Sequence, residues 1–295
     1  MSLLLPLRLW WPAIRPKTLS LAAVPVFAGA ALAWSEGAAP RTGLFLLTLA
    51  TAVLIQAGTN LFNDAQDAES GNDGPDRLGP LRVTGSGLAT ARQVRRSAIL
   101  SFALALAGGI TLVAAGGLPI LLIGLTALLA GWAYSGGPLP LSHTPAGELF
   151  VVAFFGLAAV GGSHYLQADA ISATALIVGL ALGLQAAAVL IMNNLRDLGP
   201  DARAGRRTLA LVLGRRRAVA AYALLMLLPF LLLFIEPGPA KVGLGWLALP
   251  LAAWLAWRCG GLSPGPEMNR QLALTALAQV LLGGLLGINL ILAAA

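Results

Sequence analysis

The chain has 295 residues, of which 58% are hydrophobic and only 11% are charged, and its mean hydropathy is +0.82. A soluble chain would carry about one quarter charged residues. The composition therefore excludes a water-soluble protein and predicts an all-α, polytopic membrane protein with a single transmembrane domain over residues 1–295. The net charge of +7 indicates no nucleic-acid partner, because the charged residues sit in a few polar breaks between apolar runs.

Apolar runs long enough to cross a lipid bilayer alternate with these breaks along the chain. Their continuity does not fit the alternating pattern of membrane-spanning strands. They predict about nine transmembrane helices in a bundle, at residues 18–35, 43–62, 95–114, 119–135, 147–165, 172–193, 217–235, 243–257 and 271–293.

The basic residues are strongly segregated between alternate breaks. Only Arg41 and Lys241 fall on the side opposite the N-terminus, and the other 17 of the 19 Lys and Arg residues fall on the N-terminal side. Basic residues accumulate in cytoplasmic loops of membrane proteins. We therefore expect a multi-pass protein of the inner (plasma) membrane whose N-terminus faces the cytoplasm.

An acid-and-amide motif occurs twice. The first copy, Asn60, Asp64 and Asp67, ends the second apolar run, and Asn193, Asp197 and Asp201 end the sixth run 133 residues later. Each copy is followed by a polar stretch and then by basic residues that open the next run. The repeat predicts two pseudo-repeated halves that place both motifs on the cytoplasmic side of the membrane.

Within each motif the residues are spaced so that a helix would present them on one face. Two carboxylates about 5 Å apart repel by roughly 3 kcal/mol at an effective dielectric constant near 20. A cation must offset this repulsion. The chain has one Cys and two His, so oxygen ligands dominate, and Mg²⁺ is the natural candidate because it binds one or two carboxylates together with water and phosphate.

Arginines follow both motifs and complete a site for a diphosphate. They are Arg77 and Arg82 after the first copy, and Arg203, Arg206 and Arg207 after the second. Their planar guanidinium groups suit phosphate oxygens. A diphosphate site at the end of an apolar bundle suits a polyprenyl diphosphate, whose departing diphosphate would leave an allylic cation. Tyr134, at the end of the fourth run, is a candidate contact for that cation or for an aromatic acceptor.

At these residues the chain resembles the UbiA superfamily of intramembrane aromatic prenyltransferases. The resemblance rests on Asn60-Leu-Phe-Asn63-Asp64-Ala-Gln-Asp67 and Asn193-Asn194-Leu-Arg196-Asp197-Leu-Gly-Pro-Asp201, and it covers nearly the whole chain. It implies a nine-helix bundle in which the motif Asn and Asp residues bind Mg²⁺ and diphosphate.

Three further segments are similar to the branch that prenylates 1,4-dihydroxy-2-naphthoate in menaquinone synthesis. They are Arg15-Pro16-Lys17-Thr18-Leu19, Arg77-Leu78-Gly79-Pro80-Leu81-Arg82 and Gly205-Arg206-Arg207-Thr208-Leu209-Ala210. This resemblance implies transfer of the prenyl group with loss of the carboxylate, giving demethylmenaquinone. Where relatives often place a basic residue between the fourth and fifth helices, this chain has His143, a candidate diphosphate donor.

The expected site therefore has three groups of residues. Asp64, Asp67, Asp197 and Asp201 would bind the metal and, with Tyr134, carry the chemistry. The expected substrate-binding residues are Asn60, Asn63, Asn193, Asn194, Lys17, Arg77, Arg82, Arg206, Arg207 and His143.

Other functions fit parts of this pattern. The acceptor could instead be homogentisate, 4-hydroxybenzoate, or a non-quinone ring such as haem or chlorophyllide. A CDP-alcohol phosphotransferase would show its acids on one helix in a pattern that is missing here. A cation-coupled transporter would place ionisable residues near the middle of the membrane, whereas these acids gather at one side.

Overall fold

The computed structural model describes residues 4–71, 78–79, 82–236, 238 and 243–294. Every regular element in these ranges is helical. In chain order the helices are α1 (Leu7–Ala13), α2 (Pro16–Ser35), α3 (Thr42–Glu69), α4 (Ala91–Ala133), η1 (Leu141–His143), α5 (Gly147–Val151), η2 (Val152–Ala158), α6 (Ala159–Ala168), α7 (Ala173–Arg196), α8 (Leu198–Arg203), α9 (Leu209–Ile235), η3 (Leu244–Ala248), α10 (Leu249–Cys259) and α11 (Met268–Ala294).

Seven helical stretches in the described part of the chain are long and apolar enough to cross a membrane. They are α2, α3, α4, the continuous run from α5 through the π-helical turn η2 to α6, α7, α9 and α11. A shorter apolar stretch covers Leu244–Cys259. The prediction of a multi-pass, all-helical membrane protein is confirmed, and the count of nine crossings stays a prediction.

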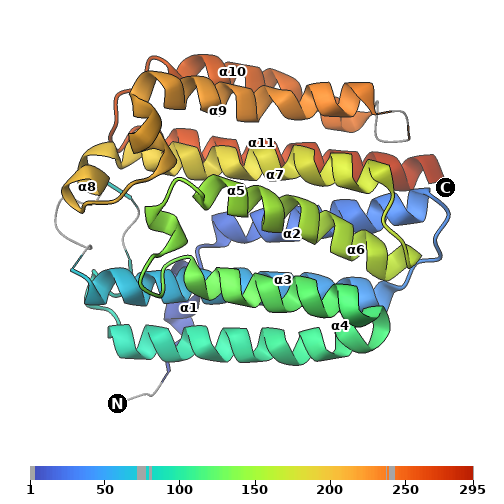
Figure 1. Cartoon of the computed structure of the whole chain (residues 1–295), viewed down its shortest axis with the longest axis horizontal. Helices are drawn as coiled ribbons and strands as arrows, with labels where there is room; N and C mark the ends of the chain where they lie inside the picture. Colours follow the sequence, from blue (N-terminus) through green and yellow to red (C-terminus); the bar gives the residue numbers. More distant parts are fainter. Residues whose placement is uncertain (1–3, 72–77, 80–81, 237, 239–242, 295) are drawn as a thin grey trace.

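The 43-residue α4 is a helical hairpin. A straight helix of this length would extend about 64 Å, roughly twice the thickness of the hydrocarbon core. Gly117 interrupts it with φ of 63° and ψ of −149°, a backbone conformation that glycine adopts without a steric penalty. A Cβ on Gly131 would lie 3.4 Å from Phe102, so the two arms pack side by side (Figure 1). The break lies between the predicted third and fourth helices.

Helix α7 occupies the centre of the bundle and is the most buried of the seven spanning stretches. It contacts α9, α11 and the α5–α6 run. Glycines allow the close approach, because a Cβ on Gly156 of η2 would stand 2.3 Å from the carbonyl oxygen of Gly179. Small residues at helix contacts are a common way to pack helices inside a membrane.

Helices α3 and α7 run in the same direction, so the C-terminal ends that carry the two motifs lie at one end of the bundle (Figure 1). We call this the motif end, and we call the opposite end, which holds Glu36, Gly117, Asp169 and Glu236, the far end. Among the described Lys and Arg residues, Arg41 alone lies at the far end. The segregation of charge predicted from the sequence is therefore present in the fold.

Candidate active site

The two motifs line one cavity of about 550 Å³. From α3 the cavity is lined by Asn60, Asn63 and Asp67, and from the end of α7 and from α8 by Asn193, Asn194, Asp197 and Asp201. This volume lies within the range of about 300–1,000 Å³ that is usual for small-molecule sites.

Arg206 joins the two motifs directly. Its Nη2 lies 3.2 Å from Asp67 Oδ1, and its Nη1 lies 3.2 Å from Asp201 Oδ1. A guanidinium group can bind two oxygens at once because its donors are held in a fixed plane. Residues that are 134 positions apart, Asp67 and Asp201, therefore lie within reach of one bound group.

Arg82 reinforces the first motif. It forms an ion pair with Asp67 and donates from Nη2 to the side-chain oxygen of Asn63 at 2.9 Å. Arg15 donates to the same oxygen at 3.3 Å. Three arginines thus face the first motif: Arg206 from the loop between α8 and α9, Arg82 from the loop before α4, and Arg15 from just before α2. Together they supply the positive charge that a diphosphate needs.

The second motif is organised by Arg196, a residue inside the motif for which the sequence predicted no role. Arg196 donates to both oxygens of Asp197, at 2.8 and 2.5 Å, and to Asn193 Oδ1 at 2.8 Å. Its Nη1 donates to Asn269 Oδ1 at 2.8 Å, which connects the motif to α11. The available signal was its place beside Asp197 inside the motif.

Asp64 differs from the other motif acids. Its side chain is buried, accepts a hydrogen bond from the Thr84 hydroxyl, and does not line the cavity. Around the axis of an ideal helix, the side chains of Asn60 and Asp67 are about 20° apart. The Asp64 side chain is rotated about 40° from Asn60 in the direction away from Asp67. Asp64 therefore meets the loop that precedes α4, and Asn60 and Asp67 face the cavity.

Asp201 is a buried carboxyl in the short helix α8, near both Asp197 and Arg206. Burial raises the pKa of Asp201 to about 6, and Arg206 lowers it in part. Removing a carboxylate from water disfavours its charged form. A cation bound here would therefore compete with a proton for Asp201.

The other predicted residues differ in whether they line the cavity. Tyr134 lines it, and burial, followed by the charge of Glu148, raises the pKa of Tyr134 to about 12. Lys17 and Arg207 are exposed and outside the lining. Arg77 lies outside the described residues.

His143 does not line the cavity, and its carbonyl oxygen accepts from the Arg207 backbone N–H at 2.9 Å. Burial, together with the nearby Arg206, lowers the pKa of the His143 ring. A ring with a lowered pKa is neutral at pH 7, so it lacks the charge of the Lys or Arg that it replaces in the sequence pattern.

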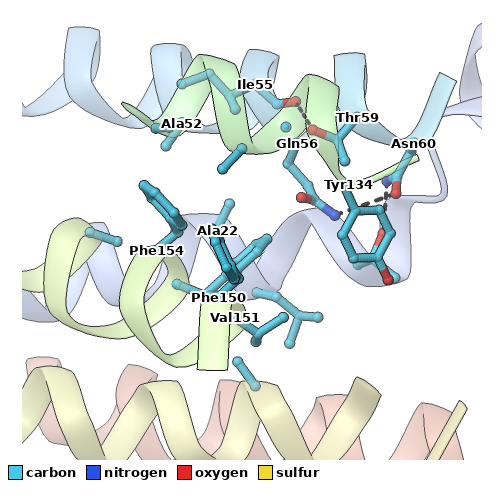
Figure 2. Close-up of a pocket in the computed structure, with 18 of the residues that line it drawn as sticks. Ala22, Ala52, Ile55, Gln56, Thr59, Asn60, Tyr134, Phe150, Val151 and Phe154 are labelled. Carbon is cyan, nitrogen blue, oxygen red and sulfur yellow. Dashed lines mark hydrogen bonds between the residues drawn. The ribbon is translucent and has the colours of Figure 1, made fainter. Parts of the chain in front are cut away.

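The rest of the cavity is apolar and elongated. Its lining on α3 begins at Thr48 and ends at Asp67, a distance of about 28 Å along the helix. Figure 2 shows Gln56, Asn60 and Tyr134 grouped at one end of the pocket, with Phe150 and Phe154 towards its middle. The two phenylalanine rings stack with their centroids 6.1 Å apart.

The polar donors at the motif end suit a hard divalent cation that shares its ligands with a substrate. Over the described ranges, no three His, Cys, Asp or Glu side chains gather closely enough to hold a metal ion by themselves. The cavity does offer carboxylates from both motifs and amide oxygens from Asn residues. Mg²⁺ fits such a set, because it binds through one or two carboxylates and completes its shell with water and phosphate.

Residues 22–275 match the family described as the UbiA prenyltransferase family. The chain belongs to this family. Among its relatives are two proteins named 1,4-dihydroxy-2-naphthoate octaprenyltransferase. The one from Mycobacterium tuberculosis is 39% identical over 82% of this chain and 83% of its own length, and the one from Escherichia coli is 38% identical over 74% and 72%.

Solved structures of UbiA homologues share the fold. The homologue from Archaeoglobus fulgidus, described as bound to DMAPP and Mg²⁺, has a TM-score of 0.64 at 17% identity and covers 96% of this chain and 99% of its own. The apo homologue from Aeropyrum pernix has a TM-score of 0.69 at 16% identity and covers 93% and 98%. The predictions of a UbiA-type fold and of a prenyltransferase enzyme are confirmed.

Proposed function

We propose that this protein transfers a polyprenyl group from polyprenyl diphosphate to 1,4-dihydroxy-2-naphthoate with loss of the carboxylate as CO₂, giving diphosphate and the quinol (dihydroxy) form of demethylmenaquinone. The observation that carries the proposal is the Arg206 bridge between Asp67 and Asp201 at the mouth of one elongated apolar cavity. The names of the relatives from E. coli and M. tuberculosis support the choice of acceptor.

In this proposal the motif end binds the diphosphate. Asp67, Asp197 and Asp201, which line the cavity, would hold Mg²⁺, which when bound offsets the negative charge that develops on the departing diphosphate. Asp64, predicted from the sequence as a fourth ligand, is bonded to Thr84 outside the cavity lining and is left out of this set. Arg82 and Arg206 would turn from the carboxylates to the diphosphate oxygens, because both already lie at the cavity. The Asn60 side-chain nitrogen donates hydrogen bonds to Ile14 O, just after α1, at 2.8 Å and to Thr18 Oγ1 in α2 at 2.9 Å, which hold Asn60 in place.

The apolar part of the cavity would hold the prenyl chain. It excludes water from the allylic cation, which would otherwise be captured by hydrolysis. Aromatic rings stabilise a nearby cation through their π faces, and Tyr134, Phe150 and Phe154 lie along this part of the wall. The naphthoate ring would form its new bond to the prenyl carbon at the carbon that bears the carboxylate. The electron pair of the breaking C–CO₂ bond then restores the aromatic ring.

The motif end would face the cytoplasm of a cell whose plasma (inner) membrane contains the protein. The concentration of described Lys and Arg residues at this end supports the orientation. Single cysteines introduced at exposed positions of each end, in a Cys259→Ala background, would report it through labelling of intact cells with a membrane-impermeant reagent. Labelling of the motif-end cysteines would contradict the orientation.

The test of the function is an assay of the purified protein with Mg²⁺, a polyprenyl diphosphate and a panel of aromatic acceptors, with products identified by mass. We expect prenylated, decarboxylated product from 1,4-dihydroxy-2-naphthoate, and little from homogentisate or 4-hydroxybenzoate. Asp197→Ala should abolish turnover in a protein that still inserts and elutes as the wild type does. Activity of that variant at the wild-type level would overturn the site assignment.

A further inference from the structure

A buried glutamate outside the two motifs contacts the active-site cavity through an asparagine. Glu148 lies in the first turn of α5 and is 5% exposed. Its Oε1 accepts a hydrogen bond from the side-chain nitrogen of Asn194 at 2.9 Å. Its Oε2 is buried without a hydrogen-bond partner in the described part of the chain. The motif chemistry proposed above gives this residue no role.

The carboxylate fixes the orientation of Asn194. An ionised carboxylate only accepts hydrogen bonds, so it must face the amide nitrogen and not the amide oxygen. The hydrogen bond from the Asn194 side-chain nitrogen to Glu148 Oε1 has this polarity. Asn194 lines the cavity, and its oxygen is therefore the atom that it offers to a ligand.

A hydrogen-bond donor lies near the same carboxylate. Tyr134 lines the cavity at its polar end (Figure 2). The negative charge of Glu148 acts on the Tyr134 phenol and, after burial, is the next cause that raises the pKa of Tyr134. Tyr134 thus keeps its proton at neutral pH and can donate it to a hydrogen bond.

We propose that Glu148 is a positioning residue for the aromatic acceptor, and that Asn194 and Tyr134 recognise a phenolic hydroxyl group of that acceptor. A hydroxyl both donates and accepts, so the Asn194 oxygen would accept from it while the Tyr134 phenol donates to it. This inference rests on the proposed function, because it assumes that a hydroxylated aromatic ring is the acceptor.

Electrostatics distinguishes the Glu148 side of the cavity from the diphosphate site, although Arg206 is close enough to act on the Tyr134 phenol. The carboxylate of Glu148 would repel a diphosphate nearby, because like charges in a partly desolvated site interact strongly. The arginines that could offset a diphosphate, Arg82 and Arg206, contact Asp67 and Asp201 instead. A neutral hydroxyl group is thus the chemistry that the Glu148 side of the cavity favours.

The experiment measures binding of acceptor analogues to full-length protein in lipid nanodiscs. The probes are 1-hydroxy- and 4-hydroxy-2-naphthoate and their methyl ethers, used as competitive inhibitors against 1,4-dihydroxy-2-naphthoate. For at least one isomer, the wild type should bind the hydroxyl compound about tenfold more tightly than its ether, as expected for one buried hydrogen bond. Glu148→Gln, whose amide no longer fixes Asn194, should reduce this ratio to below about threefold.

The other readouts distinguish positioning from general damage. In Glu148→Gln the KM for the polyprenyl diphosphate should stay within about twofold of the wild type, while the KM for the acceptor rises about tenfold. Glu148→Asp keeps an acceptor-only carboxylate and should restore most of the hydroxyl preference. Asn194→Ala removes the amide itself, and it gives a second test of the lost preference if Glu148→Gln fails to accumulate.

Glu236 provides the matched control. It is also a buried glutamate with one oxygen bonded, to Thr174 Oγ1 at 2.7 Å, but it lies at the far end. Glu236→Gln should leave the hydroxyl preference unchanged. An unchanged preference in both Glu148→Gln and Asn194→Ala, or an equal rise of both KM values, would overturn the inference alone. A wild-type protein that prenylates no naphthoate would overturn the proposed function and this inference together.

Discussion

The two ends of the bundle both carry buried or paired charges, but they use them differently. At the far end Arg41 makes two hydrogen bonds to Asp169, at 2.8 and 2.5 Å. There, His164 lies 2.8 Å from Glu36 Oε2 and 2.9 Å from the carbonyl oxygen of Ala170. These groups tie the ends of α2 and α6 to the loops that follow them.

At the motif end the arginines connect separate elements around a cavity, and Arg206 is shared between acids of both motifs. Arg206 contacts Asp67 and Asp201, and Arg196 contacts Asp197 and Asn269. The cavity continues into an apolar channel, whereas at the far end Glu36 and His164 line only a smaller pocket of about 310 Å³. Ion pairing alone therefore does not mark a site in this protein. What distinguishes the candidate site is a cation, Arg206, shared between distant acids beside an apolar cavity.

The largest expected difference between the two ends follows from removing one carboxylate at each. We expect Asp67→Asn to lower kcat by about a hundredfold to a thousandfold, the usual effect of losing one group that stabilises transition-state charge. Asp169→Asn at the far end should change kcat by less than about twofold, because exposed ion pairs contribute little. Initial rates at saturating Mg²⁺ measure both, and equal losses in the two variants would contradict the comparison.

The Arg206 bridge gives the next largest effect. Arg206→Ala should lower kcat/KM for the polyprenyl diphosphate by about a hundredfold, and Arg206→Lys by about tenfold, because an ammonium group cannot bind two oxygens in one plane. Arg41→Ala removes a comparable pair at the far end and should leave kcat/KM within about twofold. If Arg206→Lys retained full activity, the two-point contact would not be needed.

The sequence was sufficient to predict a multi-pass, all-helical membrane protein, the break near Gly117 and the meeting of the two motifs at one end. Those features depend on hydrophobic length, on glycine and on charge segregation, all of which are local in the chain. The contacts of Arg196 and Asn269 could not be predicted, since they join residues 73 positions apart through packing. The turn of Asp64 towards Thr84 likewise depends on how the loop before α4 folds back.

The structure adds one further contrast that the sequence could not give. Glu148 and Glu236 are both lone glutamates at the ends of apolar runs; the predicted topology puts them on opposite sides of the membrane, but nothing in the sequence tells which of them faces the cavity. Only Glu148 faces a side chain that lines the cavity. The direction in which a buried polar group points is a tertiary property, so residue spacing alone does not reveal it.

The pH dependence of stability and of kcat/KM also distinguishes the two ends of the bundle, because the titrating group, Asp201, lies at the motif end. With its pKa raised to about 6, Asp201 binds a proton more tightly in the folded than in the unfolded chain. Stability from this group is present below about pH 4 and is lost as the pH rises through about 6. If Asp201 binds Mg²⁺ as proposed, a proton would displace the ion below about pH 6, so kcat/KM should fall by up to about tenfold per pH unit.

Because the metal and the proton compete, raising the Mg²⁺ concentration tenfold should move the acidic limb of the pH–rate profile to lower pH. The control is Glu36→Gln, a far-end variant whose profile should shift with Mg²⁺ as that of the wild type does. An acidic limb that stays in place at every Mg²⁺ concentration would contradict the assignment of Asp201 as a metal ligand.

The smallest effect on activity is expected at the far-end clasp of Glu36, His164 and Ser172. His164 faces two acceptors, and Ser172 donates to Glu36 Oε1 at 2.9 Å. His164→Gln should lower the free energy of unfolding by about 1–3 kcal/mol, the usual cost of leaving a buried polar group unpaired, and should leave kcat/KM within about twofold. Thermal unfolding in detergent, followed together with initial rates, measures both.

A double-mutant cycle with Glu36→Gln decides whether the clasp acts as one unit. If it does, the double variant should be less destabilised than the sum of the single variants, because each removes the same contact. A His164→Gln variant that is stable but has lost activity would show instead that the far end is coupled to the motif end. Such coupling would require two conformations of the protein that differ at the clasp and have different affinities for the substrate. A group far from the diphosphate site has no direct contact through which it could change the affinity for the diphosphate.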